Sequence, residues 1–310
     1  MPTIEVQKIT QLTGHNAAVY ALSPGPEAPL FLSGAGEGWV AQWDLRNPKD
    51  GQLVAKVESN IFALCYLPAQ HQLVVGNMHG GIHWVDLSQS DQTKNIAHHQ
   101  GGVFAIRQIG DFLYTLGGEG LLTRWSIAEQ RSLESFHLTN QSLRCLAYHP
   151  KKNELAIGAS DHAIYLLDAQ HLTVKEKREK AHDNSVFSLQ YTPDGQRLIS
   201  GGRDAHLKVW TLESGLALIS DQSAHWYTIN HIAIHPTQAI FATASRDKTI
   251  KIWDLHDYRL LKVLDKAKYQ GHGHSVNGLY WSTFGDYLIS CSDDRTLIIW
   301  EVRLVATDSD

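Results

Sequence analysis

Residues 224–254 read AHWYTINHIAIHPTQAIFATASRDKTIKIWD, and this stretch decides the fold. It has a histidine at 225, continues through Thr243 and Asp247, and ends on the pair Trp253-Asp254. Between these polar residues lie short apolar runs separated by turn residues, a pattern typical of antiparallel strands. The stretch therefore predicts one small β-meander.

The same pattern recurs along the whole chain. An apolar strand ends on a tryptophan, or on its replacement, at Trp43, Trp84, Trp125, Leu167, Trp210, Trp253 and Trp300. The steps between these residues are 41, 41, 42, 43, 43 and 47. Four of the tryptophans follow a histidine by 28 residues, namely the histidines at 15, 182, 225 and 272. A period of about 40 to 45 residues with such marks is the signature of propeller blades, so we predict seven blades.

These marks resemble the WD40-repeat, G-protein β-subunit-like family. The resemblance rests on Gly14-His15 through Trp43-Asp44, on Ala181-His182 through Trp210, and on Trp253-Asp254, and it covers about residues 4–302. It implies an all-β fold, a seven-bladed WD40 β-propeller, with residues 1–310 forming one domain. The expected blades are approximately 14–58, 59–97, 98–138, 139–180, 181–223, 224–270 and 271–302, the last completed by residues 4–12 and followed by a short tail at 303–310.

The chain ends predict how the ring closes. The last repeat stops at Trp300-Glu301-Val302 and leaves no later stretch for an outermost strand. Residues Ile4 to Leu12 precede Gly14-His15 just as Leu260 to Tyr269 precede Gly271-His272. We therefore expect the N-terminal strand to pair into the last blade, which removes the open sheet edges.

The resemblance also implies a four-residue polar network of His, Ser or Thr, Asp and Trp in each blade. A buried carboxylate needs surrounding donors, and imidazole, hydroxyl and turn amides supply them. By spacing, complete sets are His182, Ser200, Asp204 and Trp210; His225, Thr243, Asp247 and Trp253; and His272, Ser290, Asp294 and Trp300.

The other four blades depart from this pattern. Blades one and three have Glu37 and Glu119 at the aspartate position, which we expect to reach outward, and Thr115 stands in blade three where blade one has Ser33. Blade two has Val57 and His79 at the histidine and aspartate positions. Blade four keeps Asp161 but has Thr139, Ile157 and Leu167 at the other three. We expect blades two and four to be held by apolar packing alone.

The composition indicates a cytoplasmic globular protein. The chain is 43% hydrophobic and 19% charged, and its 27 basic and 32 acidic residues leave a net charge of −5. No apolar run approaches the roughly 18 residues of a membrane span, and the N-terminus lacks the features of a signal peptide. The charge does not match a nucleic-acid-binding surface, so we expect neither nucleic acid nor membrane as a partner. Cys65, Cys145 and Cys291 lie far apart in apolar runs and are interpreted as buried, reduced thiols.

Several histidines invite a catalytic or metal-binding interpretation. His272 and His99 occupy the histidine register of their repeats, and no Cys, Asp or Glu cluster completes a ligand set around His274 or His98. His149-Pro150 and His235-Pro236 fall where the repeat expects a turn. We therefore predict no metal, no cofactor and no catalytic residue, although an enzyme with a site in the central channel stays open as an alternative.

In proteins of this family the top face gathers the residue after the first apolar residue of each inner strand and the residue before the turn aspartate. The partner-binding residues expected by this register, with one neighbouring aromatic residue, are Tyr20, Phe62, Met78, Phe104, Arg144, Phe187, Arg203, Arg246 and Tyr227. Four of them would form an apolar sector over blades one to three: Tyr20, Phe62, Met78 and Phe104. Three others would form a basic arc over blades four to six: Arg144, Arg203 and Arg246. Trp39 and Trp226 would enlarge this surface. Aromatic residues, Met and Arg are enriched at interface hot spots.

The predicted function is a non-catalytic protein–protein interaction scaffold or adaptor. Its partner would be another protein or a peptide with an apolar anchor beside an acidic or phosphorylated group, bound to a monomeric propeller within a complex. The alternative for the same residues is that the aromatic side chains plug the channel. A narrower alternative is a ubiquitin-ligase substrate receptor, because Trp43-Asp44-Leu45-Arg46 and Trp300-Glu301-Val302-Arg303 resemble the short box of such receptors.

Overall fold

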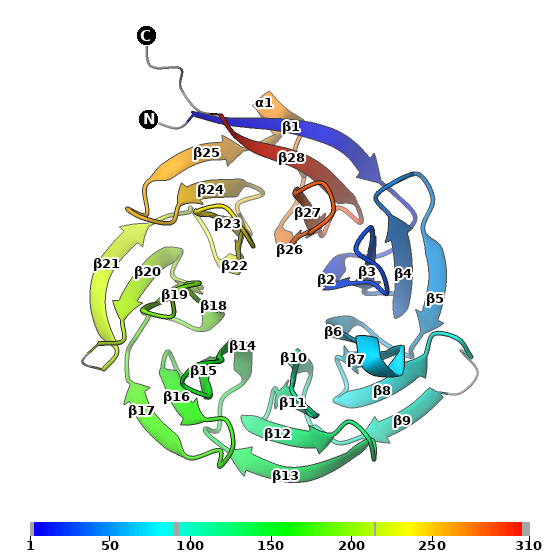
Figure 1. Ribbon diagram of the computed structural model, residues 1–310, viewed down its shortest axis with the longest axis vertical. Coiled ribbons are helices and arrows are strands. Elements are labelled where there is room, and N and C mark those ends of the chain that lie inside the picture. Colours follow the sequence, from blue (N-terminus) through cyan, green and yellow to red (C-terminus); the bar gives the residue numbers. More distant parts are fainter. Residues whose placement is uncertain (1–2, 90–92, 214, 306–310) are drawn as a thin grey trace.

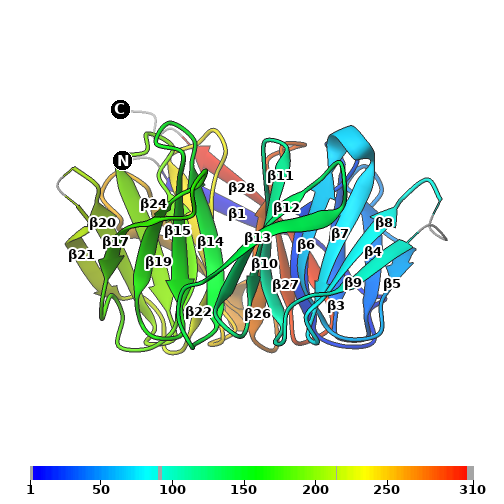
Figure 2. The ribbon, with the colours of Figure 1, turned by 90° about the horizontal axis from the view of Figure 1, so that it is seen from below.

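The computed structural model describes residues 3–89, 93–213 and 215–305. Across these residues the strands form seven four-stranded antiparallel sheets arranged in a ring, with the inner strand of each sheet nearest the centre (Figure 1). Seen from the side, the ring is a disc whose strands run across its thickness (Figure 2). The prediction of an all-β, seven-bladed propeller is confirmed.

Each of the first six blades is a simple meander, numbered from its inner strand outward. Blade one contains β2 (Val19–Pro24), β3 (Leu30–Ala35), β4 (Trp39–Asp44) and β5 (Gln52–Lys56). Blade two contains β6 (Ile61–Leu67), β7 (Gln72–Asn77), β8 (Gly81–Asp86) and β9 (Thr93–Ala97), with a 3-10 turn at Pro68–Gln70. Blade three contains β10 (Val103–Ile109), β11 (Phe112–Gly117), β12 (Leu121–Ser126) and β13 (Arg131–His137).

The second half of the ring repeats this arrangement. Blade four contains β14 (Leu143–His149), β15 (Glu154–Ala159), β16 (Ile164–Asp168) and β17 (Val174–Arg178). Blade five contains β18 (Val186–Tyr191), β19 (Arg197–Gly202), β20 (His206–Thr211) and β21 (Ala217–Ser223). Blade six contains β22 (Ile229–Ile234), β23 (Ile240–Ser245), β24 (Ile250–Asp254) and β25 (Leu260–Leu264), followed by the short helix α1 (Lys266–Tyr269).

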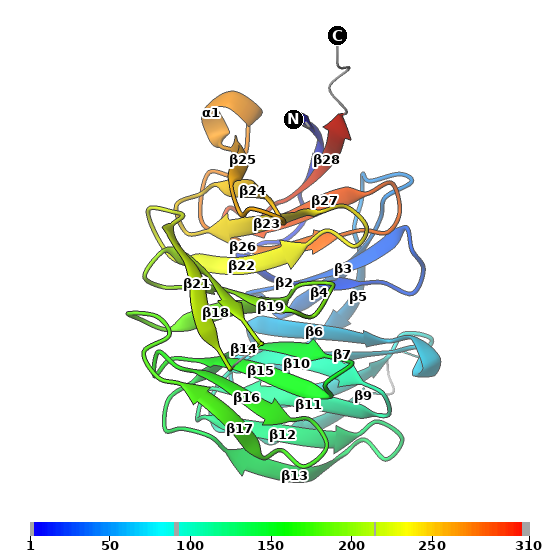
Figure 3. The same ribbon diagram turned by 60° about the vertical axis from the view of Figure 1, so that its left-hand side comes forward.

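Blade seven joins the two ends of the chain. It contains β26 (Val276–Trp281), β27 (Tyr287–Ser292) and β28 (Leu297–Val305), and β1 (Thr3–Leu12) is its outermost strand. The pairing runs from Thr3 opposite Val305 to Leu12 opposite Leu297. The two strands lie side by side at the rim (Figures 1 and 3), so the predicted closure is confirmed. Strand β28 continues three residues into the segment expected as a tail, and positions 306–310 lie outside the described residues.

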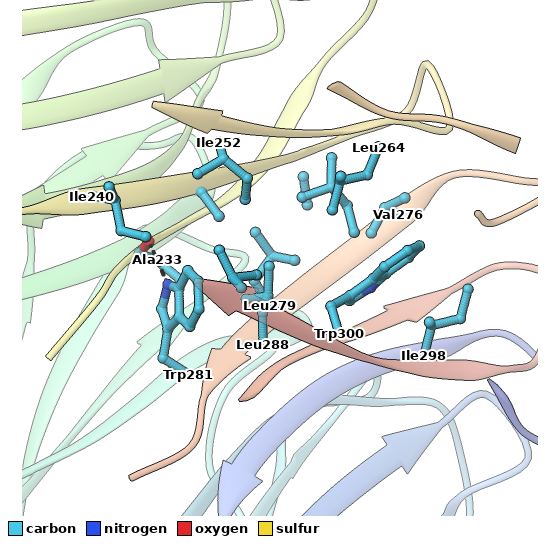
Figure 4. Packing of buried hydrophobic residues seen from close by; sticks show 14 of the residues in the cluster. Ala233, Ile240, Ile252, Leu264, Val276, Leu279, Trp281, Leu288, Ile298 and Trp300 are labelled. Carbon is cyan, nitrogen blue, oxygen red and sulfur yellow. Dashed lines mark hydrogen bonds between the residues drawn. The ribbon is translucent and has the colours of Figure 1, made fainter. Parts of the chain in front are cut away.

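The apolar core is a set of seams between blades and has no single centre. Each pair of neighbouring blades shares one cluster of buried apolar residues, and seven such clusters lie within the described residues. Figure 4 shows the seam between blades six and seven, where Ile252 and Leu264 lie opposite Leu279 and Trp300. Because both faces of every sheet are covered in this way, the second strand of each blade is buried along almost its whole length.

Candidate functional site

The complete polar networks of blades five to seven stand behind the loops of one face. In blade five the His182 imidazole contacts the Asp204 carboxylate at 3.0 Å through Nδ1 and the Ser200 hydroxyl at 2.8 Å through Nε2. The Trp210 indole N–H donates to the same hydroxyl at 2.8 Å. The corresponding bonds in blades six and seven join His225, Thr243, Asp247 and Trp253, and His272, Ser290, Asp294 and Trp300.

The glutamates of blades one and three also join such networks. Glu37 lies 2.6 Å from Nδ1 of His15 and accepts the Ala17 amide at 3.0 Å. Glu119 lies 2.7 Å from Nδ1 of His99. The expectation that these carboxylates reach outward was therefore wrong, because the buried imidazole keeps the carboxylate as its partner despite the extra methylene.

Blades two and four are not held by apolar packing alone, which corrects a second expectation. In blade two the Asn77 amide donates to Glu58 at 2.7 Å and to Nε2 of His83 at 3.0 Å, while Nδ1 of His83 donates to Asn95 at 2.7 Å. Blade four uses a shorter link, in which the Tyr165 hydroxyl donates to Asp161. Different residues thus meet the same need to satisfy buried polar groups.

Each inner strand has a β-bulge near its first residue, at the end of the strand that lies on the same face as these networks. In all seven blades the register shifts across the second residue of the inner strand, and the bulged residues are Tyr20, Phe62, Phe104, Arg144, Phe187, Asn230 and Asn277. These are the positions that the repeat register had singled out. A bulge re-aims a side chain, and all seven line a cavity of about 300 Å³ at the mouth of the channel.

The bulged aromatic residues contact one another around this mouth. The Tyr20 and Phe62 rings lie 5.3 Å apart edge to face, and the Phe62 and Phe104 rings stack at 5.5 Å. The Arg144 guanidinium lies 4.2 Å from the ring of Phe104 and 5.3 Å from that of Phe187. One aromatic chain therefore runs from blade one to blade five, with a cation inserted in it.

Arg144 is the charged residue of the mouth. Its Nε donates to the Ser160 hydroxyl at 2.9 Å, and among the described residues it forms no ion pair. Burial lowers the pKa of Arg144, and the positive charge of Arg203 lowers it further. No Asp or Glu is among the described residues that line this cavity. The mouth is therefore a partly buried positive site with aromatic side chains on one side and neutral polar side chains on the other.

The other predicted residues, Met78, Arg203, Arg246 and Tyr227, do not line this cavity and stand on the loops of the same face. Met78 is 48% exposed, Arg203 and Arg246 are exposed, and Tyr227 is 61% exposed. Trp226 is 87% exposed although its amide is bound to Asp247 at 3.1 Å, so a fixed backbone holds this side chain in solvent. Trp39 is not brought to the mouth; it lines a separate cavity beside Trp43 and Leu53.

Two channel residues escaped the sequence reasoning. His231 follows the bulge of blade six, at a position where the other blades have Ala21, Ala63, Ala105, Cys145, Ser188 and Gly278. Its Nδ1 is buried without a partner, and burial lowers the pKa of His231 to about 4. Arg107 lies two residues farther along its own inner strand, and burial lowers its pKa. The other six blades have a small residue at this position, so the single histidine stands out in a comparison of the repeats. That comparison would have identified His231 from the sequence.

The cysteines and the arginines of the two receptor-like boxes were the remaining candidates for a functional role. Burial raises the pKa of the Cys65 thiol to about 11 and that of Cys145 to about 12, so both are protonated at neutral pH. Arg46 of the first receptor-like box forms an ion pair with Asp44 at 2.7 Å, and Arg303 of the second pairs with Glu301 within β28.

Comparison with known proteins agrees with this architecture. The WD40 family model (WD domain, G-beta repeat) matches residues 6–44, 174–211, 217–254 and 265–301. The structure of the WD40 beta propeller domain of Doa1 superposes with a TM-score of 0.83 over 96% of both chains at 18% sequence identity. The fold is thus that of a seven-bladed β-propeller. The chain is a WD40-repeat protein of this propeller type.

Curated relatives match it over single segments. Protein HIRA of Dictyostelium discoideum is 30% identical over 137 residues, which are 38% of this chain and 12% of that protein. Nuclear distribution protein nudF of Aspergillus niger is 29% identical over 176 residues, 55% of this chain and 38% of that protein. Probable cytosolic iron-sulfur protein assembly protein 1 of Candida glabrata is 32% identical over 133 residues, 40% of each chain. The chain therefore matches less than half the length of each of these relatives.

Proposed function

We propose that the chain is a non-catalytic scaffold or adaptor that binds a peptide or loop of another protein at the mouth of its channel. The observation that carries the proposal is Arg144, whose guanidinium lies between two phenylalanine rings without an ion pair in the described residues. A guanidinium held in this way is preorganised for a carboxylate or a phosphate. The bound segment is therefore acidic or phosphorylated.

The surroundings of Arg144 define the rest of the bound segment. Phe62 and Phe104 offer an apolar contact on one side, and Met78 stands exposed at the same edge. Arg203 and Arg246 are exposed in the loops of blades five and six, and the charge of Arg203 acts on Arg144. A segment with an apolar anchor followed by acidic groups matches this order of surfaces. Tyr20 and Phe187 complete the aromatic chain on either flank.

The charge and the relatives support the class of partner proposed here. Two relatives carry names that refer to nuclear distribution and to iron-sulfur protein assembly, so different processes use related repeats. The net charge of −5 argues against nucleic acid as the partner. Among the described residues no helix is long and apolar enough to cross a membrane. We propose a cytoplasmic, monomeric propeller that works within a larger complex.

A peptide array tests the proposal. Peptides of varied sequence, each in plain, glutamate-substituted and phosphoserine forms, are probed with the wild-type protein and with Arg144→Gln. The wild type should select acidic or phosphorylated peptides, and Arg144→Gln should bind them about tenfold or more weakly, since a charge-assisted hydrogen bond is lost. Arg131→Gln, on the exposed outer strand β13, is the matched control and should bind as the wild type does.

Two further variants distinguish a binding surface from a channel plug. Phe62→Ala combined with Phe104→Ala should abolish binding of the selected peptides at a nearly unchanged melting temperature. Arg203→Glu should weaken binding and make the remainder less sensitive to salt, because the attracting charge is reversed. Undiminished binding by the double variant, or its unfolding, would return the aromatic residues to the role of a plug.

A further inference from the structure

The face opposite the channel mouth contains a cavity that the proposed function does not use. It has a volume of about 410 Å³ and lies where the turn after β18 meets the turn after β22, between blades five and six. The turn after β24 forms its outer wall. Its volume is in the range of cavities that hold small ligands or peptide ends.

The two neighbouring seams are filled at the corresponding place by an imidazole. Six residues after the start of the inner strand, blade four has His149 and blade six has His235. The His149 ring packs on Tyr191 of blade five at 5.1 Å, and its Nε2 donates to the Gly195 carbonyl at 3.0 Å. The His235 ring packs on Trp281 of blade seven at 4.5 Å. Each imidazole thus closes the seam toward the next blade.

Blade five has a threonine at this place. The Thr192 hydroxyl turns back into its own loop, donating to Asp194 at 2.6 Å and accepting the Arg197 amide at 3.1 Å. Opposite it, blade six has Ile234 where the other two seams have an aromatic ring. This seam therefore has neither an imidazole from its first blade nor an aromatic ring facing it from its second blade, and the cavity lies at this place, with His235 in its wall.

The walls of the cavity offer three kinds of contact. Pro193, Leu255 and Tyr258 supply apolar surface. The side-chain oxygen of Gln238 is buried and has no hydrogen-bond partner, so it needs a donor. The guanidinium of Arg197 forms no ion pair or side-chain hydrogen bond among the described residues, although its charge acts on the Asp194 carboxylate in the same wall. The Thr192 hydroxyl and the Gln196 amide already donate to that carboxylate, so the guanidinium can still bind an anion.

We propose that this cavity binds a carboxylate that carries a neighbouring N–H group and an apolar side chain. The carboxylate pairs with Arg197, and the apolar side chain packs against Leu255 and Tyr258. The N–H group donates to the side-chain oxygen of Gln238 once that buried amide turns toward the cavity. This is the chemistry of an apolar amino acid, present either as the free molecule or as the carboxyl end of a peptide. The site is separate from Arg144 and from the proposed function.

Three probes measured by calorimetry test the proposal: N-acetyl-L-leucine, N-acetyl-L-leucinamide and L-leucine. N-acetyl-L-leucine should bind about tenfold or more tightly than its amide, which lacks the charge for Arg197. Tighter binding of N-acetyl-L-leucine than of L-leucine identifies a peptide end as the ligand, and the reverse order identifies the free amino acid. Failure of all three to bind at millimolar concentration would overturn the proposal.

Variants locate the binding in the cavity. Thr192→His places an imidazole where the neighbouring seams have one and should reduce binding at least tenfold. The change also removes a hydroxyl that holds the turn, so circular dichroism checks that the variant stays folded. Gln238→Leu should also reduce binding, while the melting temperature stays equal or rises because an unsatisfied acceptor is removed. Arg144→Gln should bind the probes as the wild type does, which separates this test from that of the channel mouth. Unchanged binding by Thr192→His would also overturn the proposal.

Discussion

At the scale of single residues, two opposing effects set the pKa of the aspartate in each polar network. Burial alone would raise the pKa of Asp204, but the hydrogen bond and charge of His182 and the amides of Asp183 and His206 outweigh it and hold the pKa at about 2. In blades six and seven the same causes hold the pKa of Asp247 and of Asp294 far below the usual range. These carboxylates are therefore charged in the folded protein because donors surround them.

Asp204→Ala should lower the free energy of unfolding by about 1–3 kcal/mol at pH 7, since His182 loses its acceptor. The pKa of Asp204 is lower in the folded than in the unfolded protein, so its contribution is present above pH 4 and disappears as the pH falls toward 2. Urea unfolding at pH 7 and pH 3 should therefore show a smaller difference between variant and wild type at pH 3. Asp183→Ala, exposed in the same blade, is the control and should behave as the wild type. An unchanged midpoint for Asp204→Ala would mean that the carboxylate is solvated.

At the scale of one blade, the tryptophans are not equivalent. The Trp125 indole N–H donates to the Thr115 hydroxyl at 2.9 Å. Blade two has Val74 ten residues before its tryptophan, and the Trp84 N–H is buried without a partner. The ring of Trp84 therefore supplies packing to blade two, whereas the ring of Trp125 also supplies a hydrogen bond.

Trp84→Phe should therefore cost less stability than Trp125→Phe. Both variants leave a similar gap, but only the second breaks a buried hydrogen bond, which is worth about 0.5–1.5 kcal/mol. Denaturant unfolding of the two variants measures the difference directly, and each serves as the control for the other. Equal losses would show that the Trp84 N–H has a partner in solution.

At the scale of the whole molecule, stability depends on closing the ring. Strand β1 contributes Ile4 to the seam between blades six and seven and Leu12 to the seam between blades seven and one. It also covers the edge of β28 along almost its entire length. A single N-terminal strand thus completes two of the apolar seams and removes an open sheet edge.

Deletion of residues 1–12, of which Met1 and Pro2 lie outside the described residues, should therefore open the ring. The exposed edge of β28 has unpaired amides and carbonyls, so the truncated protein should aggregate and melt at a lower temperature. Size-exclusion chromatography and thermal unfolding provide the measurement. A monomer with the wild-type melting temperature would show that closure does not need this strand.

The repeated part of the structure could be predicted because each blade is specified by a short, continuous segment of the sequence. The interval between His225 and Trp253 sets one blade, and its recurrence sets the ring. The same register located the residues of the channel mouth, since every inner strand bulges at the same position. The orientation of Glu37 and the network around His83 were missed, because the partners of these side chains come from other segments: His15 lies in the loop after β1, and Asn95 lies in β9.

The number of blades and the closing strand could be read from the sequence alone, because strand length, turn residues and repeat spacing are local properties of the chain. The seven positions around the channel were implied by the resemblance to the WD40 family and its register. Only the tertiary structure decided that Arg144 lies between two phenylalanine rings and that Thr192 leaves a cavity where its neighbours place an imidazole. Both features arise at seams between blades. A seam joins residues about forty positions apart, and its filling depends on the combined volume of side chains from two repeats, which neither repeat specifies alone.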